Sequence, residues 1–213
     1  MKVEIYSDVA CPWCYVGTAR FERALAEFPG RDDVQVVFRS YQLDPAAPFA
    51  SEPMYDYLAR RFGGDPRAMT ARVVELARGE GLAMDFERGR SVNTLLAHRL
   101  LWQAEREHGP ERQRAVAEAL FRAHFAEGRD VGDVETLVEI AAGAGMDAEG
   151  TRAVLQSSEG TRAVQEAIAE AQRLGITAVP TFVFEGRWAV QGAQATSTFA
   201  EALAAVARET GDR

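Results

Sequence analysis

The only two cysteines of this 213-residue chain are Cys11 and Cys14, separated by Pro12 and Trp13. The run before them, residues 3–7, alternates in the manner of a strand, and residues 14–27 have the periodicity of a helix. A cysteine pair at this spacing, directly after a strand and at the start of a helix, is typical of a dithiol that cycles between its reduced and disulfide forms.

The geometry of such a helix start predicts different roles for the two thiols. Pro12 suits the first helical position, because its fixed φ is already helical and its missing N–H would have no partner there. Cys11 then caps the helix, where free backbone N–H groups and the positive end of the helix dipole favour a thiolate. We expect Cys11 to be the exposed nucleophile and Cys14, one turn further in, to resolve the mixed disulfide.

Other uses of the two cysteines fit less well. A structural zinc site needs about four ligands, and the remaining candidates, His98, His108 and His124, lie far from the pair in the sequence. A permanent disulfide would close a very short loop and would constrain the unfolded chain little. Two inert buried cysteines would not explain a Pro-Trp pair at a strand-to-helix turn. We expect a redox dithiol with no bound metal or cofactor.

Composition and charge restrict the partners and the compartment. The formal net charge is -8, with 47% hydrophobic and 26% charged residues, which is typical of a soluble globular protein and argues against nucleic acid or an anionic membrane as a partner. The amino terminus enters the first strand without the basic start and apolar run of a secretory signal. We expect a cytoplasmic protein, since disulfides there are transient and catalytic. Oligomeric state is not indicated.

The order of elements predicts an interrupted α/β fold. A second strand at 34–41 should pair in parallel with the first through a right-handed crossover. From 53 to about 155 the periodicity predicts helices alone, and their candidate caps are Asp65, Ser91, Asn93, Asp133 and Asp147. A helix at 158–174, strands at 182–184 and 188–190, and a helix at 196–208 complete the chain. We predict an α/β domain formed by 1–43 and 157–213, with an all-helical insertion at 44–156.

The segment Val179-Pro180-Thr181 lies between a predicted helix and a predicted strand. A cysteine pair on the first helix needs a facing loop, and this segment is the candidate. We expect a cis bond before Pro180, which would leave the Val179 backbone free to pair with an extended peptide. The alternative is a trans-proline at the start of a strand.

Five segments, in order along the whole chain, resemble the DsbA-like thioredoxin-fold oxidoreductases, most closely their cytoplasmic FrnE-type branch. They are SDxxCPWCYxG at 7–17, QLDP at 42–45, NTxxAHRL at 93–100, VPTFVF at 179–184 and GAQ at 192–194. The resemblance implies a thioredoxin-like fold, βαβ … αββα, with an inserted helical domain. It also implies a thiol–disulfide oxidoreductase or isomerase that acts on protein or peptide disulfides, with glutathione or thioredoxin as a redox partner.

The site residues that the resemblance implies fall into three groups. Cys11 and Cys14 would be catalytic, with Pro12 between them. Trp13, also between them, would offer an exposed aromatic surface to substrate. The substrate-binding residues would be Val179, Pro180, Thr181 and Gln194.

Two supporting residues have open roles. Asp8 could shuttle protons or could cap the turn before Cys11, and its carboxylate would oppose a thiolate rather than activate it. His98 shares a helix face with Leu95 and Trp102, which favours a structural histidine, although the resemblance places that helix over the cleft.

Two other functions compete with the oxidoreductase. Kappa-class glutathione transferases and 2-hydroxychromene-2-carboxylate isomerases, which use glutathione on aromatic metabolites, are similar around Asp8. They generally have serine where Cys11 stands and a Ser-Asp pair near Ala193-Gln194, and this chain differs at both places. A holdase-type chaperone that binds clients in an apolar cleft is the third alternative. The cysteine pair favours the oxidoreductase.

Overall fold

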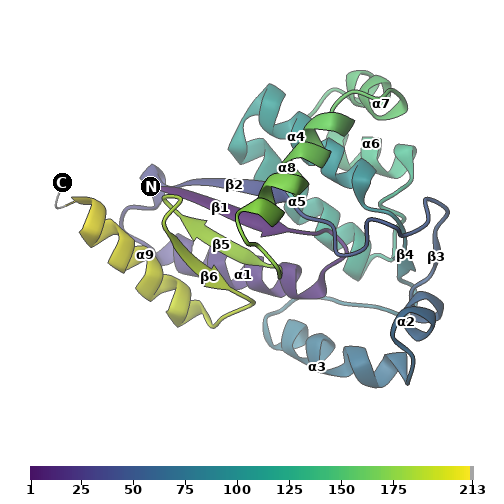
Figure 1. Ribbon diagram of the computed structural model, residues 1–213, viewed down its shortest axis with the longest axis horizontal. Helices are drawn as coiled ribbons and strands as arrows, with labels where there is room; N and C mark the ends of the chain where they lie inside the picture. Colours follow the sequence, from purple (N-terminus) through teal and green to yellow (C-terminus); the bar gives the residue numbers. More distant parts are fainter. Residues whose placement is uncertain (212–213) are drawn as a thin grey trace.

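The computed structural model describes residues 1–211, and a mixed sheet lies at its centre, with the strand order β2-β1-β5-β6 (Figure 1). β1 (Lys2–Ser7) pairs in parallel with β2 (Gln35–Ser40) and antiparallel with β5 (Thr181–Phe184). β5 turns back into β6 (Trp188–Gln191). Segments from the two ends of the chain therefore build one sheet, and the α/β class with an interrupting segment is confirmed.

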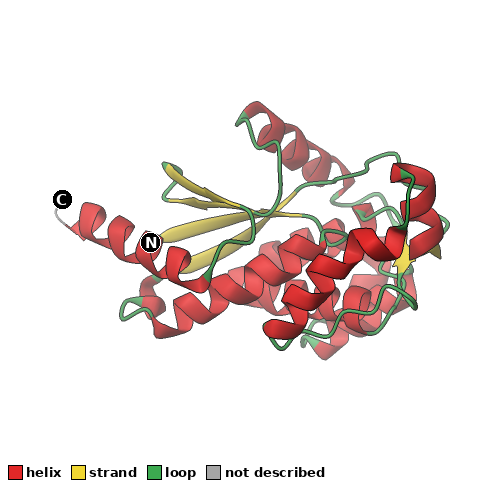
Figure 2. Cartoon of the chain, turned by 90° about the horizontal axis from the view of Figure 1, so that it is seen from below, coloured by secondary structure: helices red, strands yellow, loops and turns green. Residues whose placement is uncertain are grey.

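Helices lie on both sides of the sheet (Figure 2). α1 (Pro12–Glu27) connects β1 to β2 and packs against α9 (Thr196–Gly211), while α8 (Thr161–Arg173) contacts β2. α9 ends at Gly211, three residues beyond the predicted end of the final helix at residue 208. A short 3-10 helix, η1 (Arg31–Asp33), precedes β2.

Aromatic side chains fill the space between β5, α1 and α9. Phe21, Phe182, Phe184 and Phe199 are completely buried, and the rings of Phe182 and Phe199 have centroids 4.5 Å apart. Burying each such side chain stabilises the fold by roughly 1.5–3 kcal/mol. This packing fixes α1, and therefore its amino-terminal end, relative to the strands.

The segment between β2 and α8 is mainly helical. Its helices are α2 (Met54–Phe62), α3 (Pro66–Gly79), α4 (Leu95–His108), α5 (Pro110–Phe121), η2 (Arg122–Ala126), α6 (Val134–Gly143) and α7 (Ala148–Gln156). Three predicted caps are confirmed, because the carboxylates of Asp65, Asp133 and Asp147 each accept a hydrogen bond from a backbone N–H of the first helical turn.

The expectation of helices alone between 53 and 155 is wrong in one place. β3 (Glu52–Pro53) pairs with β4 (Arg90–Ser91), so Ser91 lies in a strand and does not cap α4. The N-cap residue of α4 is Thr94 rather than Asn93, but Asn93 Oδ1 accepts from the N–H of Leu95, the first helical residue, at 3.0 Å. α5 continues into η2, a π-helical turn, so this part of the chain is helical as predicted, although apolar periodicity provides no signal for the change to a π-helix.

Helix α8 begins at Thr161 rather than at residue 158. Gly160, immediately before it, has a φ of 76°, in the left-handed region that favours glycine. A side chain at this position would also lie 2.5 Å from the ring of Trp102. Close packing against α4 therefore sets the start of α8.

One side chain of the helical segment extends the sheet. β2 is an edge strand, and the buried amide of Gln113 on α5 bonds to both backbone groups of Phe38. The Phe38 N–H donates to Gln113 Oε1 at 2.8 Å, and Gln113 Nε2 donates to the Phe38 carbonyl at 3.0 Å. The amide thus satisfies backbone groups that a further strand would otherwise pair.

The buried apolar side chains form one cluster with members from the sheet and from the helical segment. The division of the chain at 43/44 and 156/157 therefore stays a prediction. No helix within residues 1–211 is long and apolar enough to span a membrane.

Candidate active site

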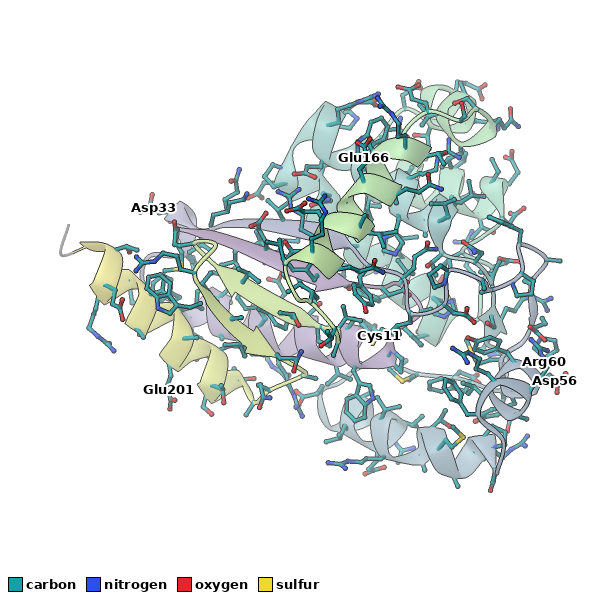
Figure 3. All side chains as sticks on the ribbon, in the orientation of Figure 1. Cys11, Asp33, Asp56, Arg60, Glu166 and Glu201 are labelled. Carbon is teal, nitrogen blue, oxygen red and sulfur yellow. The ribbon has the colours of Figure 1, made fainter. Side chains whose placement is uncertain are left out.

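Cys11 and Cys14 lie at the start of α1, as predicted. Cys11 is the N-cap residue, with extended φ and ψ of -90° and 110°, and Pro12 is the first helical residue. Both cysteines are free thiols. In Figure 3 Cys11 lies near the ends of the strands, toward the helices of the intervening segment. The amino end of α1 thus holds the pair at the boundary between the two parts of the chain.

The expectation that Cys11 is exposed is wrong, because only 3% of its surface is accessible. Its Sγ lies 3.7 Å from the carbonyl oxygen of Val179, to which the thiol donates. Cys14 is completely buried. Burial raises the pKa of the Cys14 thiol well above its ordinary value, the neighbouring Cys11 raises it further, and the Ser7 hydroxyl opposes this. The two thiols therefore differ in environment, and only Cys11 borders a cleft.

The loop before β5 lies against Cys11. The Val179–Pro180 bond is cis, as predicted, and the Thr181 hydroxyl donates to the Ala178 carbonyl at 2.7 Å. Gly17 on α1 permits the close approach, since a Cβ at this position would lie 2.9 Å from Pro180 Cγ. The sequence pattern contains Gly17 but does not indicate this packing role.

A cleft of about 430 Å³ adjoins Cys11 on the side of α2 and α3. Its wall is mainly apolar and includes Cys11, Trp13, Met54, Arg61, Val73 and Phe86. Trp13 is 36% exposed, in agreement with its expected place on the surface. The residues of the described chain that line the cleft do not include Val179, Thr181 or Gln194. The side-chain amide of Gln194 donates to the Gln191 carbonyl at 2.8 Å and closes the turn after β6.

Asp8 and His98 form a buried pair beside the cleft, whose lining includes Asp8 but not His98. His98 Nε2 lies 3.3 Å from Asp8 Oδ1, and both side chains are at most 2% exposed. Asp8 also accepts from the N–H groups of Ala10, at 3.3 Å, and Leu43, at 2.7 Å. Burial alone would raise the pKa of Asp8, but the hydrogen bonds from His98 and from the Leu43 N–H outweigh burial and lower it. These contacts agree with the alternative in which Asp8 caps the turn before Cys11.

The start of α4 is tied to the loop after β2 by contacts that the sequence patterns do not indicate. Asn93 Nδ2 donates to the carbonyls of Pro45 and Ala47, and Gln42 Nε2 donates to Asn93 Oδ1 at 3.1 Å. Leu43, in the same loop, donates to Asp8. The 42–45 and 93–100 motifs therefore meet in space and hold Asp8 beside His98.

His124, in η2, is a second buried histidine, and neither of its ring nitrogens has a hydrogen-bond partner among the described residues. Burial lowers the pKa of His124 to about 4, although the charges of Asp8 and Asp130 act in the opposite direction. No group of three or more Cys, His, Asp or Glu side chains in residues 1–211 is arranged to hold a metal ion.

Replacing His124 with leucine is expected to remove a source of acid instability. The pKa of histidine is about 6.5 in an unfolded chain, so on acidification the unfolded chain binds the proton while the folded protein, with its pKa near 4, does not. His124 therefore does not affect the free energy of unfolding of the parent above about pH 6.5, and it lowers this free energy progressively between pH 6.5 and pH 4. At 1.36 kcal/mol per pH unit, this amounts to about 3 kcal/mol.

Urea unfolding of the parent and His124→Leu at several pH values measures this effect, since subtracting the two free energies cancels the contributions of the carboxylates. His108→Gln, at the exposed carboxyl end of α4, is the matched control and should follow the parent. A constant difference between His124→Leu and the parent from pH 7 to pH 4 would contradict the expectation.

Comparison with known proteins gives a family and a fold. The model of the DSBA-like thioredoxin domain family matches residues 2–204. A structure described as a probable DsbA oxidoreductase from Streptomyces coelicolor is 41% identical, with a TM-score of 0.89, over 100% of this chain and 91% of that one.

Two less similar structures show the fold alone. The cytosolic disulfide reductase DsbM from Pseudomonas aeruginosa, solved with GSH, is 20% identical, with a TM-score of 0.68, over 98% of this chain and 100% of that one. A 2-hydroxychromene-2-carboxylate isomerase is 16% identical, with a TM-score of 0.72, over 100% of this chain and 98% of that one. The predicted thioredoxin-like fold is thereby confirmed, whereas the FrnE-type branch stays a prediction.

Proposed function

Because the chain belongs to the DSBA-like thioredoxin domain family, we propose that it exchanges the disulfides of proteins or peptides through Cys11 and Cys14. The family and the fold support a thiol–disulfide oxidoreductase or a related isomerase. The observation that supports the dithiol mechanism is the position of the two free thiols at the start of α1, where Cys11 borders a cleft and Cys14 is completely buried.

The proposed reaction has two exchanges. The Cys11 thiolate attacks one sulfur of the substrate disulfide, so that a mixed disulfide forms and the other substrate sulfur leaves as a thiolate. Cys14 then attacks the Cys11 sulfur. The Cys11–Cys14 disulfide forms and the second substrate thiol is released, so that the substrate is reduced and the protein oxidised. The reverse sequence oxidises a dithiol substrate.

The surrounding residues have proposed roles as well. Trp13 presents its exposed ring beside the cleft, and the loop Val179-Pro180-Thr181 holds the substrate backbone near the Cys11 sulfur, with Gln194 supporting the turn after β6. We place the reaction in the cytosol, where thiols are kept reduced, with glutathione or thioredoxin as the redox partner.

Replacing Cys14 with serine tests this proposal. We expect Cys14→Ser to accumulate a mixed disulfide between Cys11 and the substrate, because attack still occurs but no second thiol resolves the adduct. Incubation with a cystine-containing peptide, followed by intact mass spectrometry without reductant, should show near-stoichiometric adduct in Cys14→Ser and little in the parent. Addition of dithiothreitol should remove it.

Two controls make the result specific. Cys11→Ser should form no adduct, and acid-quenched peptide mapping should locate the added mass on Cys11 in the Cys14→Ser protein. The proposal would be wrong if the adduct were absent from Cys14→Ser, or if Cys11→Ser formed the adduct through Cys14.

A further inference from the structure

Cys14 must lose a proton in order to resolve a mixed disulfide, yet it is completely buried. Three neighbouring groups affect the pKa of its thiol: the Cys11 thiol adds to the rise that burial causes, whereas the Ser7 hydroxyl and the backbone N–H of Asp8 oppose it. Of these, a hydroxyl can accept a proton and pass its own to a further acceptor, whereas a backbone N–H can only donate. A path for the Cys14 proton therefore leads through Ser7.

The Asp8 carboxylate is not suited to receive this proton. Ala10, Leu43 and His98 already bond to it, the Thr94 hydroxyl also lowers its pKa, and these groups leave few of the lone-pair sites of the carboxylate free. Its pKa lies below the ordinary value in spite of burial. Asp8 therefore remains an anion.

An ionised Asp8 determines which nitrogen of His98 is basic. Because the Asp8 oxygens can only accept, the His98 Nε2 beside them must have the hydrogen. In the neutral ring Nδ1 is then unprotonated. Nδ1 is buried and has no hydrogen-bond partner among residues 1–211. His98 thus has a free lone pair on Nδ1, while Asp8 on its other side would stabilise the charge of a protonated ring.

A small cavity connects this histidine to Ser7. Both residues line it, together with Val9, Phe38 and Arg39. Its volume is about 10 Å³, which is close to the room that a single water molecule needs. One water in this cavity would span the gap between the Ser7 hydroxyl and His98.

We infer that His98 is the proton acceptor for Cys14, through Ser7 and one water molecule, and that Asp8 orients and stabilises it. This inference rests on the proposed dithiol function. In the resolving step Cys14 forms the bond to the Cys11 sulfur, and the bond from Cys11 to the substrate sulfur breaks with its electron pair on the substrate. The Cys14 proton moves to Ser7, the Ser7 proton to the water, and a water proton to His98 Nδ1. The path reverses when the protein disulfide is reduced.

The other ionisable groups around His98 do not replace it. Arg39, which lines the same cavity from β2, has its charge compensated by Glu4 and Glu105, at 2.8 and 3.3 Å. His124 lies close enough to Asp8 to respond to its charge, but its pKa near 4 makes it a weak base. His98 is therefore the base that the arrangement favours.

Single-turnover kinetics of His98→Gln test the inference. A glutamine amide can still donate to Asp8, but it is not a base. Reduced protein is mixed with a fluorescent cystine peptide, and adduct formation and peptide release are followed from pH 6 to pH 9. We expect the release phase of His98→Gln to be about 100-fold slower at pH 7 and to rise with pH up to pH 9. The parent rate should change little above pH 7.

Two further variants separate proton transfer from a loss of structure. Ser7→Ala, which removes the hydroxyl at the other end of the path, should slow release with the same pH dependence. His124→Gln, a buried histidine outside the path, should release peptide at the parent rate. A release rate within twofold of the parent in both His98→Gln and Ser7→Ala would overturn the inference alone. A parent protein that forms no Cys11 adduct would overturn the proposed function, and with it the inference.

Discussion

Replacing Cys11 with serine is expected to reduce the catalysed reduction of insulin disulfides to the uncatalysed background, a loss of about a thousandfold or more. The reason is chemical, because a serine hydroxyl is not ionised near neutral pH and cannot form a disulfide. Little structure should be lost, since a hydroxyl can also donate to the Val179 carbonyl that accepts from the Cys11 thiol. Turbidity of insulin with dithiothreitol as the reductant measures the rate.

The control for this experiment is the thermal midpoint of Cys11→Ser, which should lie close to that of the parent. Full insulin-reducing activity in Cys11→Ser would contradict the dithiol mechanism. The variant also separates the enzyme classes, since the alternative of a glutathione-dependent isomerase or transferase does not need a thiol at this place. Glutathione-dependent turnover of an aromatic substrate that survives in Cys11→Ser would favour that class instead.

Local sequence signals predicted the parts of the fold that depend on a few neighbouring residues. The strand before Cys11, the proline-started helix after it and the aspartate caps of α3, α6 and α7 each depend on side chains within about one turn. The parallel pairing of β1 with β2 followed from the expectation of a right-handed crossover through the first helix. These features are determined by local geometry and by the alternation of apolar residues.

Apart from the loop at Val179-Pro180, which was expected to face the cysteines, features that depend on contacts between distant segments were not predicted. Cys11 was expected on the surface because a helix end is commonly solvated, yet Val179, 168 residues away, covers its sulfur. The pairing of Ser91 with Glu52 likewise depends on two loops that meet in space. His98 was placed on a helix face by its spacing, but its partner Asp8 is 90 residues distant. Periodicity describes one element at a time and does not indicate which elements meet.

Arg99, next to His98 on α4, also makes contacts with a distant segment that periodicity does not indicate. Its replacement has the largest expected effect on stability. Its buried guanidinium donates to four backbone carbonyls, those of Val154 and Leu155 in the last turn of α7 and of Ser157 and Glu159 beyond it. The last carbonyls of a helix have no partner within the helix, and a cation is favoured there. Arg99 therefore holds together α4, α7 and the turn before α8.

Replacing Arg99 with methionine, which has a similar length but no donors, is expected to lower the free energy of unfolding by about 4 kcal/mol or more. The loss arises because the carbonyls remain in a buried place, and each unsatisfied group costs about 1–3 kcal/mol. The free energy of unfolding of Arg99→Lys should lie between those of the parent and Arg99→Met, since an ammonium has three donors and cannot span all four oxygens. Guanidinium chloride unfolding followed by circular dichroism measures the change.

Arg106 on the same helix is the matched control for this change. Its side chain is 42% exposed, pairs with Glu159 at 2.6 Å, and lies over the Trp102 ring. Exposed ion pairs contribute at most about 1 kcal/mol, so Arg106→Met should cost much less than Arg99→Met, although both remove one positive charge from α4. Equal losses in the two variants would show that charge alone is responsible, whereas a large loss confined to Arg99→Met would result from the unpaired carbonyls at the end of α7.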